Sequence, residues 1–198
     1  MISRTIQGKA DESCGGFFTT GSEIAVSGGC ITTTANVSNS ELADATKDGE
    51  PDIFSFSVGG YSGKFYIEKQ TGPVGNKVKG KVVLIPQQDV KIDYIVTSVE
   101  GSDCSNRFRL QRFMLTTPDG VKYEFGSCDN SPSAIEIMNN NESNFWTANG
   151  WYLKKISSAD GVNSIVLNYT AEAYRYHYRS SRGGTGMTPK IVFIRQQR

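Results

Sequence analysis

The sequence predicts an all-β protein whose antiparallel hairpins form a sandwich or a curved sheet. Three observations favour this fold class. Apolar and polar residues alternate in several runs, as in 53–58, where Phe54, Phe56 and Val58 share one face of a strand. Glycine-centred turns separate these runs. The chain also holds 21 glycines, 10 phenylalanines and 9 tyrosines among 198 residues, a composition typical of short strands joined by tight turns.

Three hairpins are marked by their turns. The turns are Gly59–Gly60, Pro118–Gly120 and Asp160–Gly161, where proline fixes an early turn position and glycine supplies the positive φ that hairpin turns need. Two further apolar runs on either side of Pro86 complete the set, since proline cannot donate a ladder hydrogen bond and belongs at a strand end. The predicted strands are 53–58, 62–67, 81–85, 90–97, 107–116, 121–126, 151–156 and 162–169.

One short helix is expected near 39–47. Ser38 and Glu41 have the spacing of a capping box, in which each side chain satisfies a backbone N–H of the first turn. Gly49 and Pro51 then end the helix after about two turns. A helix of that length cannot form a layer of its own, so the fold class stays all-β.

The domain organisation expected from composition is one β-rich domain, 1–178, followed by a Gly/Ser linker and a C-terminal strand, 179–198. The strand Lys190–Arg195 has no evident partner close in the sequence, so we expect it to be disordered, to pair with a distant strand or to pair with another molecule. Together with an N-terminus that lacks a signal-peptide pattern, this favours a chain that is a truncated piece of a longer protein.

Charge and hydropathy argue against two classes of partner. The formal net charge is +1, which provides no general attraction to nucleic acid. No apolar run approaches the roughly 20 residues that span a bilayer, so membrane insertion of this segment is not expected. The four cysteines contain no C-x-x-C pair, and both two disulfides and four buried thiols stay open. They are Cys14, Cys30, Cys104 and Cys128.

The acidic residues Asp48, Glu50 and Asp52 alternate in the way that calcium-binding loops often do, because a hard cation needs several oxygen ligands. Asp44 could add a fourth. The alternative is that Glu50 and Pro51 simply lead into the strand that begins at residue 53. No cofactor is required by the sequence, and calcium is the one ion that the pattern suggests.

Exposed aromatic residues are the candidates for ligand binding, since aromatic faces suit sugar rings. Tyr174, Tyr176 and Tyr178 would share one face of a strand, and Trp146 and Trp151 flank the start of the third hairpin. Core packing is the competing interpretation for both groups, and it is the favoured one. A glycan is therefore the alternative partner.

Catalysis is not expected. His177 is the single histidine, so any Ser-His-Asp or Cys-His arrangement would have to use it. No nucleophile elbow, phosphate loop or metal-binding helix motif surrounds it or the cysteines. A glycosidase-type pair of carboxylates stays open, because two such acids need not be close in the sequence. The sequence thus predicts a protein that is not an enzyme.

Several segments, in order along roughly residues 1 to 170, resemble the region that precedes the repeats in RHS/YD-repeat cell-surface proteins of the Bacteroides group. The segments are Ile2–Glu12, Asp48–Phe56, Tyr61–Phe65, Leu84–Asp89, Thr116–Tyr123 with Phe125–Gly126, and Trp151–Ile156. The resemblance implies a non-catalytic structural segment of a large exported protein, located outside the cell or on its surface. Its partner would be the remainder of the same polypeptide. The chain has no Tyr-Asp repeat itself, so the β-rich shell of that family is implied only for the parent protein.

Overall fold

The computed structural model describes residues 1–8, 10–11, 24–27, 30–33, 50–69, 80–98, 108–126, 134–139, 146–175 and 190–196. Every regular element among them is a β-strand, so the predicted all-β class is confirmed. The helix expected near 39–47 lies outside the described residues.

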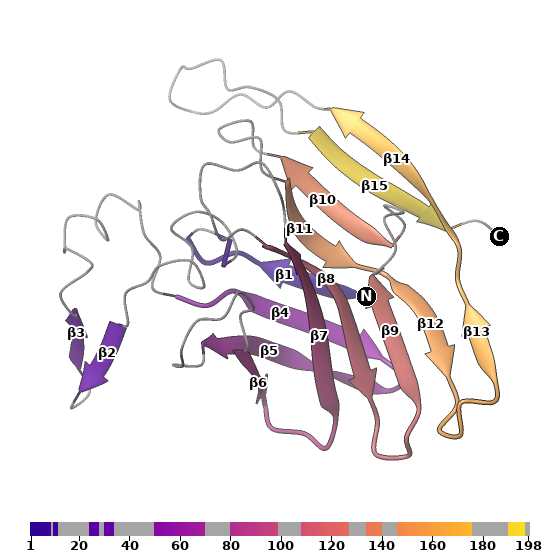
Figure 1. Cartoon of the computed structure of the whole chain (residues 1–198), viewed down its shortest axis with the longest axis horizontal. Coiled ribbons are helices and arrows are strands. Elements are labelled where there is room, and N and C mark those ends of the chain that lie inside the picture. The colour runs from indigo at the N-terminus through magenta and orange to yellow at the C-terminus, as the bar shows by residue number, and fades with distance from the viewer. Residues whose placement is uncertain are drawn as a thin grey trace.

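The strands form two large antiparallel sheets and a separate two-stranded hairpin (Figure 1). The larger sheet has the order β14-β15-β10-β11-β1-β4-β5-β6, the smaller sheet the order β13-β12-β9-β8-β7, and β2 pairs with β3. The strands are β1 (Ile2–Thr5), β2 (Ile24–Ser27), β3 (Cys30–Thr33), β4 (Ile53–Val58), β5 (Tyr61–Lys69), β6 (Gly80–Ile85), β7 (Lys91–Ser98), β8 (Phe108–Thr116), β9 (Lys122–Gly126), β10 (Ile135–Asn139), β11 (Trp146–Trp151), β12 (Leu153–Ser157), β13 (Ser164–Val166), β14 (Tyr169–Arg175) and β15 (Lys190–Gln196).

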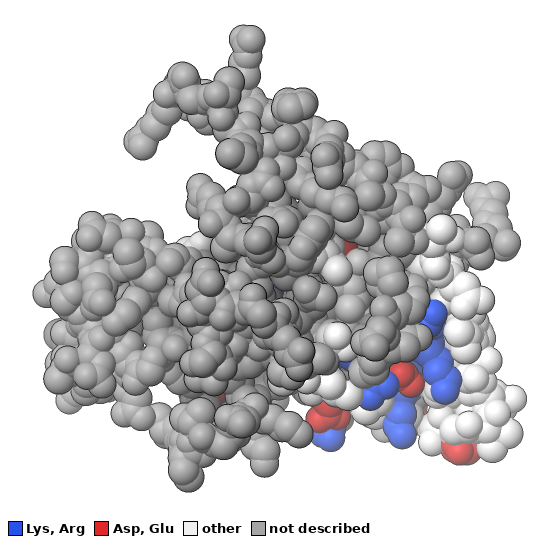
Figure 2. All heavy atoms as spheres, turned by 45° about the horizontal axis from the view of Figure 1, so that its top comes forward, with Lys and Arg blue, Asp and Glu red and all other residues white. Residues whose placement is uncertain are grey.

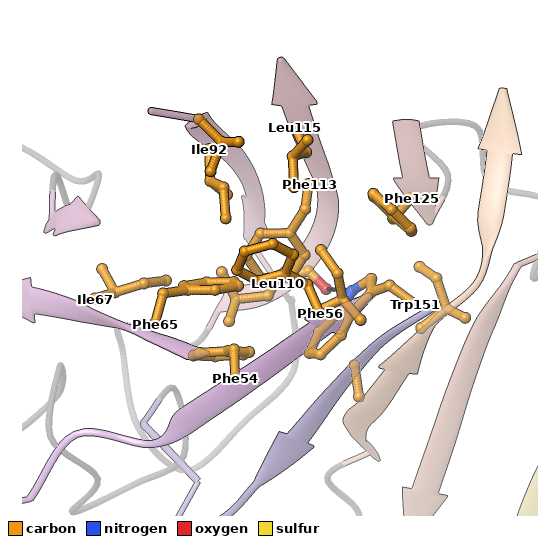
Figure 3. Packing of buried hydrophobic residues seen from close by; sticks show 14 residues of the cluster. Phe54, Phe56, Phe65, Ile67, Ile92, Leu110, Phe113, Leu115, Phe125 and Trp151 are labelled. Carbon is orange, nitrogen blue, oxygen red and sulfur yellow. Dashed lines mark hydrogen bonds between the residues drawn. The ribbon is translucent and has the colours of Figure 1, made fainter. Parts of the chain in front are cut away.

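The core lies between the two large sheets, which makes the fold a β-sandwich (Figure 3). Phe54 and Phe65 face each other across β4 and β5 and stack with ring centroids 5.0 Å apart. Phe113 of the opposite sheet packs against both rings, at 5.4 Å and 5.5 Å. The alternation of residues 53–58 thus has the physical cause that the sequence indicates, because Phe54 and Phe56 are both buried in this core.

Six of the eight predicted strands agree with the structure to within two residues at each end. The other two predictions are wrong in one respect, because each run is divided where the chain crosses from one sheet to the other. The run 151–156 is divided at Tyr152, between β11 in the larger sheet and β12 in the smaller. The run 162–169 is divided between β13 and β14 in the same way. Strand-forming residues continue through both crossings, so residue types alone do not reveal the bend.

The C-terminal strand has neighbours on both sides. β15 pairs with β14 along seven residues, and its other side pairs with β10. The expectation that this strand lacks a partner nearby in the sequence is wrong, since β14 precedes it by one connection. β15 also belongs to the same sheet as β1 (Figure 1). The division expected at residue 178 stays a prediction. Strand pairing depends on matching edges and register, which the composition of the linker does not encode.

The sandwich is closed on one side by a tyrosine. β6 and β7 are the edge strands of the two sheets on this side. The Tyr94 hydroxyl of β7 donates a hydrogen bond to the Gly80 carbonyl oxygen, at 3.0 Å, and accepts one from the Gly80 N–H, at 2.5 Å. One side chain thus satisfies both backbone groups of the first residue of β6 and joins the two sheets at their edges.

We expect Gly126→Ala to destabilise the fold by at least about 2 kcal/mol, because Gly126 combines a positive φ with a tight contact. Its φ is +82°, and a Cβ atom would lie 2.1 Å from the Gln111 carbonyl oxygen. Gly60→Ala is the matched control, since Gly60 has a φ of +83° with no atom within 4 Å of the added carbon. Urea unfolding of both variants measures the difference. Equal losses of stability would show that the contact at Gln111 is unimportant.

Candidate functional site

Trp151 lies in the core, so the prediction that it binds a ligand is wrong. Its side chain is fully buried, and its indole meets the Phe113 ring edge-on, with centroids 4.9 Å apart (Figure 3). The indole Nε1–H donates to the Leu110 carbonyl oxygen at 3.0 Å. A sugar could not stack on this ring without opening the sandwich. The competing interpretation from the sequence, core packing, is therefore correct for Trp151.

The other predicted aromatic ligands are not assembled into a site by the described residues. Trp146 opens β11, and Tyr174 lies in β14 opposite Ile191, but their side chains are outside what the structure describes. Tyr176, Tyr178 and His177 also lie outside the described residues. The carbohydrate-binding role of these side chains stays a prediction.

Asp52 binds an arginine where the sequence suggested a calcium ligand. Its fully buried carboxylate forms an ion pair with the guanidinium of Arg4. Its Oδ1 accepts a hydrogen bond from the Gln7 N–H at 2.8 Å, and its Oδ2 accepts one from the Asp11 N–H at 3.0 Å. Both oxygens are therefore engaged within the protein, and the calcium prediction is wrong for this residue. Asp48 lies outside the described residues, as does Asp44.

Glu50 is exposed and lies three positions before the first residue of β4. Within the described ranges, no three His, Cys, Asp or Glu residues are grouped so that they could hold a metal ion.

Arg4 connects three segments that are far apart in the sequence. From β1, its Nε donates to Asp52 Oδ2 at 2.7 Å, just before β4. A second guanidinium nitrogen donates to the Ala148 carbonyl oxygen of β11 at 3.1 Å, across 144 positions of the chain. The guanidinium carbon also lies 5.6 Å from the centre of the Phe54 ring, within the range of a cation–π contact. Arg4 thus acts as a buried cross-link in the middle of the larger sheet.

The electrostatic balance at Asp52 is set by its burial. Loss of water raises the pKa of the Asp52 carboxyl above its ordinary value, while Arg4 and the N–H groups of Asp11 and Gln7 act in the opposite direction. Asp11 returns a hydrogen bond, since its Oδ1 accepts from the Asp52 N–H at 3.0 Å. These contacts fasten the chain after β1 to the start of β4. Arg4, Asp11 and Asp52 therefore stabilise the fold, a role that the spacing of residues in the sequence did not indicate.

A second polar cluster, formed by Glu136, Tyr152 and Tyr169, lies where the chain crosses between the sheets. The Tyr152 and Tyr169 rings are 5.8 Å apart. The Tyr152 hydroxyl donates to Glu136 Oε2 at 3.3 Å, and the Tyr169 hydroxyl donates to the Leu153 carbonyl oxygen at 2.6 Å. All three side chains are half-buried. The sequence analysis missed this cluster, because its members come from β10, from the crossing between β11 and β12, and from β14, and share no motif.

Alkaline pH is expected to destabilise the protein through its half-buried tyrosines. Burial raises the pKa of Tyr94, Tyr152 and Tyr169, and the nearby Glu136 raises that of Tyr152 further. In the unfolded chain a tyrosine loses its proton near pH 10, while the folded protein still holds it. The unfolded state then binds fewer protons, so the free energy of unfolding falls as the pH rises above about 10.

Urea unfolding between about pH 8 and pH 11 measures this slope. The double variant Tyr94→Phe with Tyr169→Phe should be less stable than the original at pH 8, because both hydroxyls form hydrogen bonds to the backbone. Its stability should nevertheless decline less steeply above pH 10. An identical decline in the variant and the original protein would contradict the assignment to these tyrosines.

One edge of the smaller sheet is both apolar and exposed. β13 pairs with β12 on one side, and no described strand pairs with its other side (Figure 1). Val162, Ile165 and Val166 are 78%, 63% and 55% exposed. We call residues 161–168 the β13 edge. It is the candidate interaction surface of the described part of the chain.

The cysteines are not brought together by the described residues. Cys30 begins β3, with its side chain outside the description, and Cys14, Cys104 and Cys128 lie outside the described residues. Disulfides and free thiols both stay open as predictions.

Comparison with protein-family models, with curated proteins and with solved structures finds no match for the chain. In the part of the chain that the structure describes, no helix has the length and the apolar character needed to cross a membrane.

Proposed function

We propose that the chain is a non-catalytic structural segment of a large exported surface protein of the RHS/YD-repeat kind. The observation that carries the proposal is the buried Arg4 cross-link, which joins β1, the start of β4 and β11 through one guanidinium group. A buried ion pair that connects distant segments favours one particular arrangement of strands, which is what a rigid building block requires. The packed aromatic side chains of the core also favour a single rigid arrangement of the two sheets.

The location and the partner follow from the sequence resemblance. The segment would lie outside the cell or on its surface, and its partner would be the remainder of the same polypeptide. The sandwich supports this role, because a module with its own core can be joined to further β-structure without refolding.

An epitope tag on intact cells tests the proposal. The turn between β12 and β13 suits an insertion at Asp160–Gly161, because both residues are exposed. With the tag inserted at that turn in the natural gene, intact cells should bind an antibody, and external protease should remove the signal. A tag on a cytoplasmic protein of the same cells is the control. Detection only after lysis would contradict export.

Carbohydrate binding is the second candidate, and the tyrosine cluster at the sheet crossing favours it. Tyr152 and Tyr169 offer half-exposed rings beside the Glu136 carboxylate, and sugar rings bind to such combinations of aromatic face and hydrogen-bond acceptor. A glycan array with the purified chain tests this candidate. Binding that is reduced by Tyr169→Ala and retained in Tyr169→Phe would favour it, provided that both variants unfold at the same urea concentration as the original. If the chain binds no glycan on the array, carbohydrate binding is contradicted and the structural role remains the proposed function.

A further inference from the structure

We propose that the β13 edge pairs with the β13 edge of a second copy of this chain, in antiparallel register, so that the two smaller sheets become one. The inference concerns self-association and does not rest on the structural role proposed above. Four observations carry it: the charge of the sheet edges, the exposure along one row of side chains, the direction of the free backbone groups and the symmetry of the resulting register.

Charge distinguishes the β13 edge from the other described edges of the two large sheets. β6 carries Lys81, β7 carries Lys91 and Asp93, and β14 carries Glu172 and Arg175. Charged side chains of this kind protect an edge strand against pairing with another chain. Residues 161–168 contain none. Figure 2 shows basic and acidic atoms gathered over the neighbouring strands of the smaller sheet, while the β13 side at the right is mostly uncharged.

A row of apolar side chains crosses the smaller sheet and ends exposed at this edge. The pairing of the strands places its five members opposite one another, and they are Ile92, Leu115, Tyr123, Ile156 and Ile165. The first two are buried in the core, the next two are half-buried, and Ile165 is 63% exposed. The row therefore continues the core to the edge of the sheet, where its last side chain meets water. A neighbouring apolar side chain in the same row would cover it.

The backbone of β13 has its free groups on the outer side. The Asn163 carbonyl oxygen accepts from Ser158, and the Leu167 N–H donates to the Lys154 carbonyl oxygen at 2.9 Å, so these two residues point toward β12. Backbone groups alternate between the two sides of a strand. The N–H and C=O groups of Ser164 and Val166 therefore point away from β12. They are available to a strand that adds to this edge.

The register that fits these groups is symmetric about Ile165. In an antiparallel pair of two β13 strands centred there, Ser164 of each copy lies opposite Val166 of the other, and the outward groups of both residues become hydrogen-bonded. The two Ile165 residues then face each other as a non-hydrogen-bonded pair, in which side chains approach most closely. The apolar row becomes continuous through both copies. Each copy supplies what the other lacks, which is the property of an interface with two-fold symmetry.

A second copy is the occupant that the charges favour. Pairing a charged edge with itself in this way would bring like charges near one another, at a cost in stability. The β13 edge avoids this cost, because it has no charge to repeat. The contact is small, so association is expected to be weak and to depend on concentration within the micromolar to millimolar range, roughly.

Sedimentation velocity of the full chain, from about 1 μM to about 1 mM, provides the first test. The sedimentation coefficient should rise with concentration toward that of a dimer. Ile165→Lys should abolish the rise, and Ile85→Lys is the matched control, since Ile85 is an exposed apolar residue on the edge strand β6. Ile165 is exposed, so its substitution should leave the urea midpoint unchanged. A sedimentation coefficient that is independent of concentration, or an equal rise in Ile165→Lys, would overturn the proposal.

Cross-linking tests the register independently of folding stability. In Ile165→Cys, mild oxidation should produce a covalent dimer, because the two new thiols would be opposite each other across the symmetry axis. In Val166→Cys the yield should be at least several-fold lower, since Val166 lies opposite Ser164 of the other copy. The unsubstituted chain under the same oxidant corrects for the four natural cysteines. Equal yields at the two positions would reject the symmetric pairing, even if the chain self-associates at another surface.

Discussion

Replacement of Arg4 by methionine is expected to lower the free energy of unfolding by about 3–5 kcal/mol, because it leaves a buried carboxylate without its partner. Asp52 would keep only the backbone N–H groups of Gln7 and Asp11 as donors. The link to the Ala148 carbonyl oxygen in β11 would be lost as well. Urea unfolding followed by circular dichroism measures the change. A loss below about 1 kcal/mol would show that Arg4 does not act as a cross-link.

The paired substitution separates the charge from the packing. Arg4→Met combined with Asp52→Leu removes both ions, and the double variant should be more stable than the sum of the two single effects predicts. Arg112→Met is the matched control, since Arg112 forms a partly exposed ion pair with Glu124. Its loss should be well below that of Arg4→Met, because such pairs stabilise folded proteins little. Additive effects of Arg4→Met and Asp52→Leu would contradict the coupling of the two side chains.

Replacement of Trp151 by alanine is expected to cost about 3–5 kcal/mol, the range for removing a large aromatic side chain from a packed core. The indole contacts Phe54 and Phe113 from the opposite sides of the sandwich, at 5.8 Å and 4.9 Å between ring centres. Trp151→Phe keeps a ring in this position and removes the hydrogen bond to the Leu110 carbonyl oxygen. Its loss should be clearly smaller, and the same unfolding experiment measures it. Similar values for the two variants would indicate that the ring contacts contribute little.

Local patterns predicted the six consecutive strands from β4 to β9 to within two residues at each end, but they missed β1, β2, β3 and β10. The alternation in 53–58 identified both the strand β4 and its buried face. The Gly59–Gly60 turn also indicated β5 as one neighbour of β4. These local patterns could not indicate the other neighbour, β1, which pairs with β4 on one side and with β11 on the other. Register and strand order depend on contacts between distant segments, and the sequence of one segment does not contain them.

The candidate functional residues were also hard to predict, because the sequence does not show which of them are buried. The alternating acids at 48–52 were consistent with a calcium loop, because the partner of Asp52 lies 48 positions away in β1. The sequence around Trp151 was also consistent with a ligand-binding surface, but Phe113 of the opposite sheet covers its ring. The exposure of Ile165 could not be predicted either, since its run of β-branched residues is typical of a strand with one buried face. Burial is decided by the neighbours, which sequence patterns alone do not identify.

The order in which the fold can form follows from the place of β1. Its partner β4 is about fifty residues away along the chain, whereas Ile2 also pairs with Trp151 at the end of β11. Until β11 has been synthesised, the larger sheet is interrupted at β1, and one side of that strand is open. Contacts of such long range make folding slow, and an open strand side is prone to pair with other chains in the meantime. The larger sheet of a growing chain therefore stays incomplete until β11 pairs with the free side of β1.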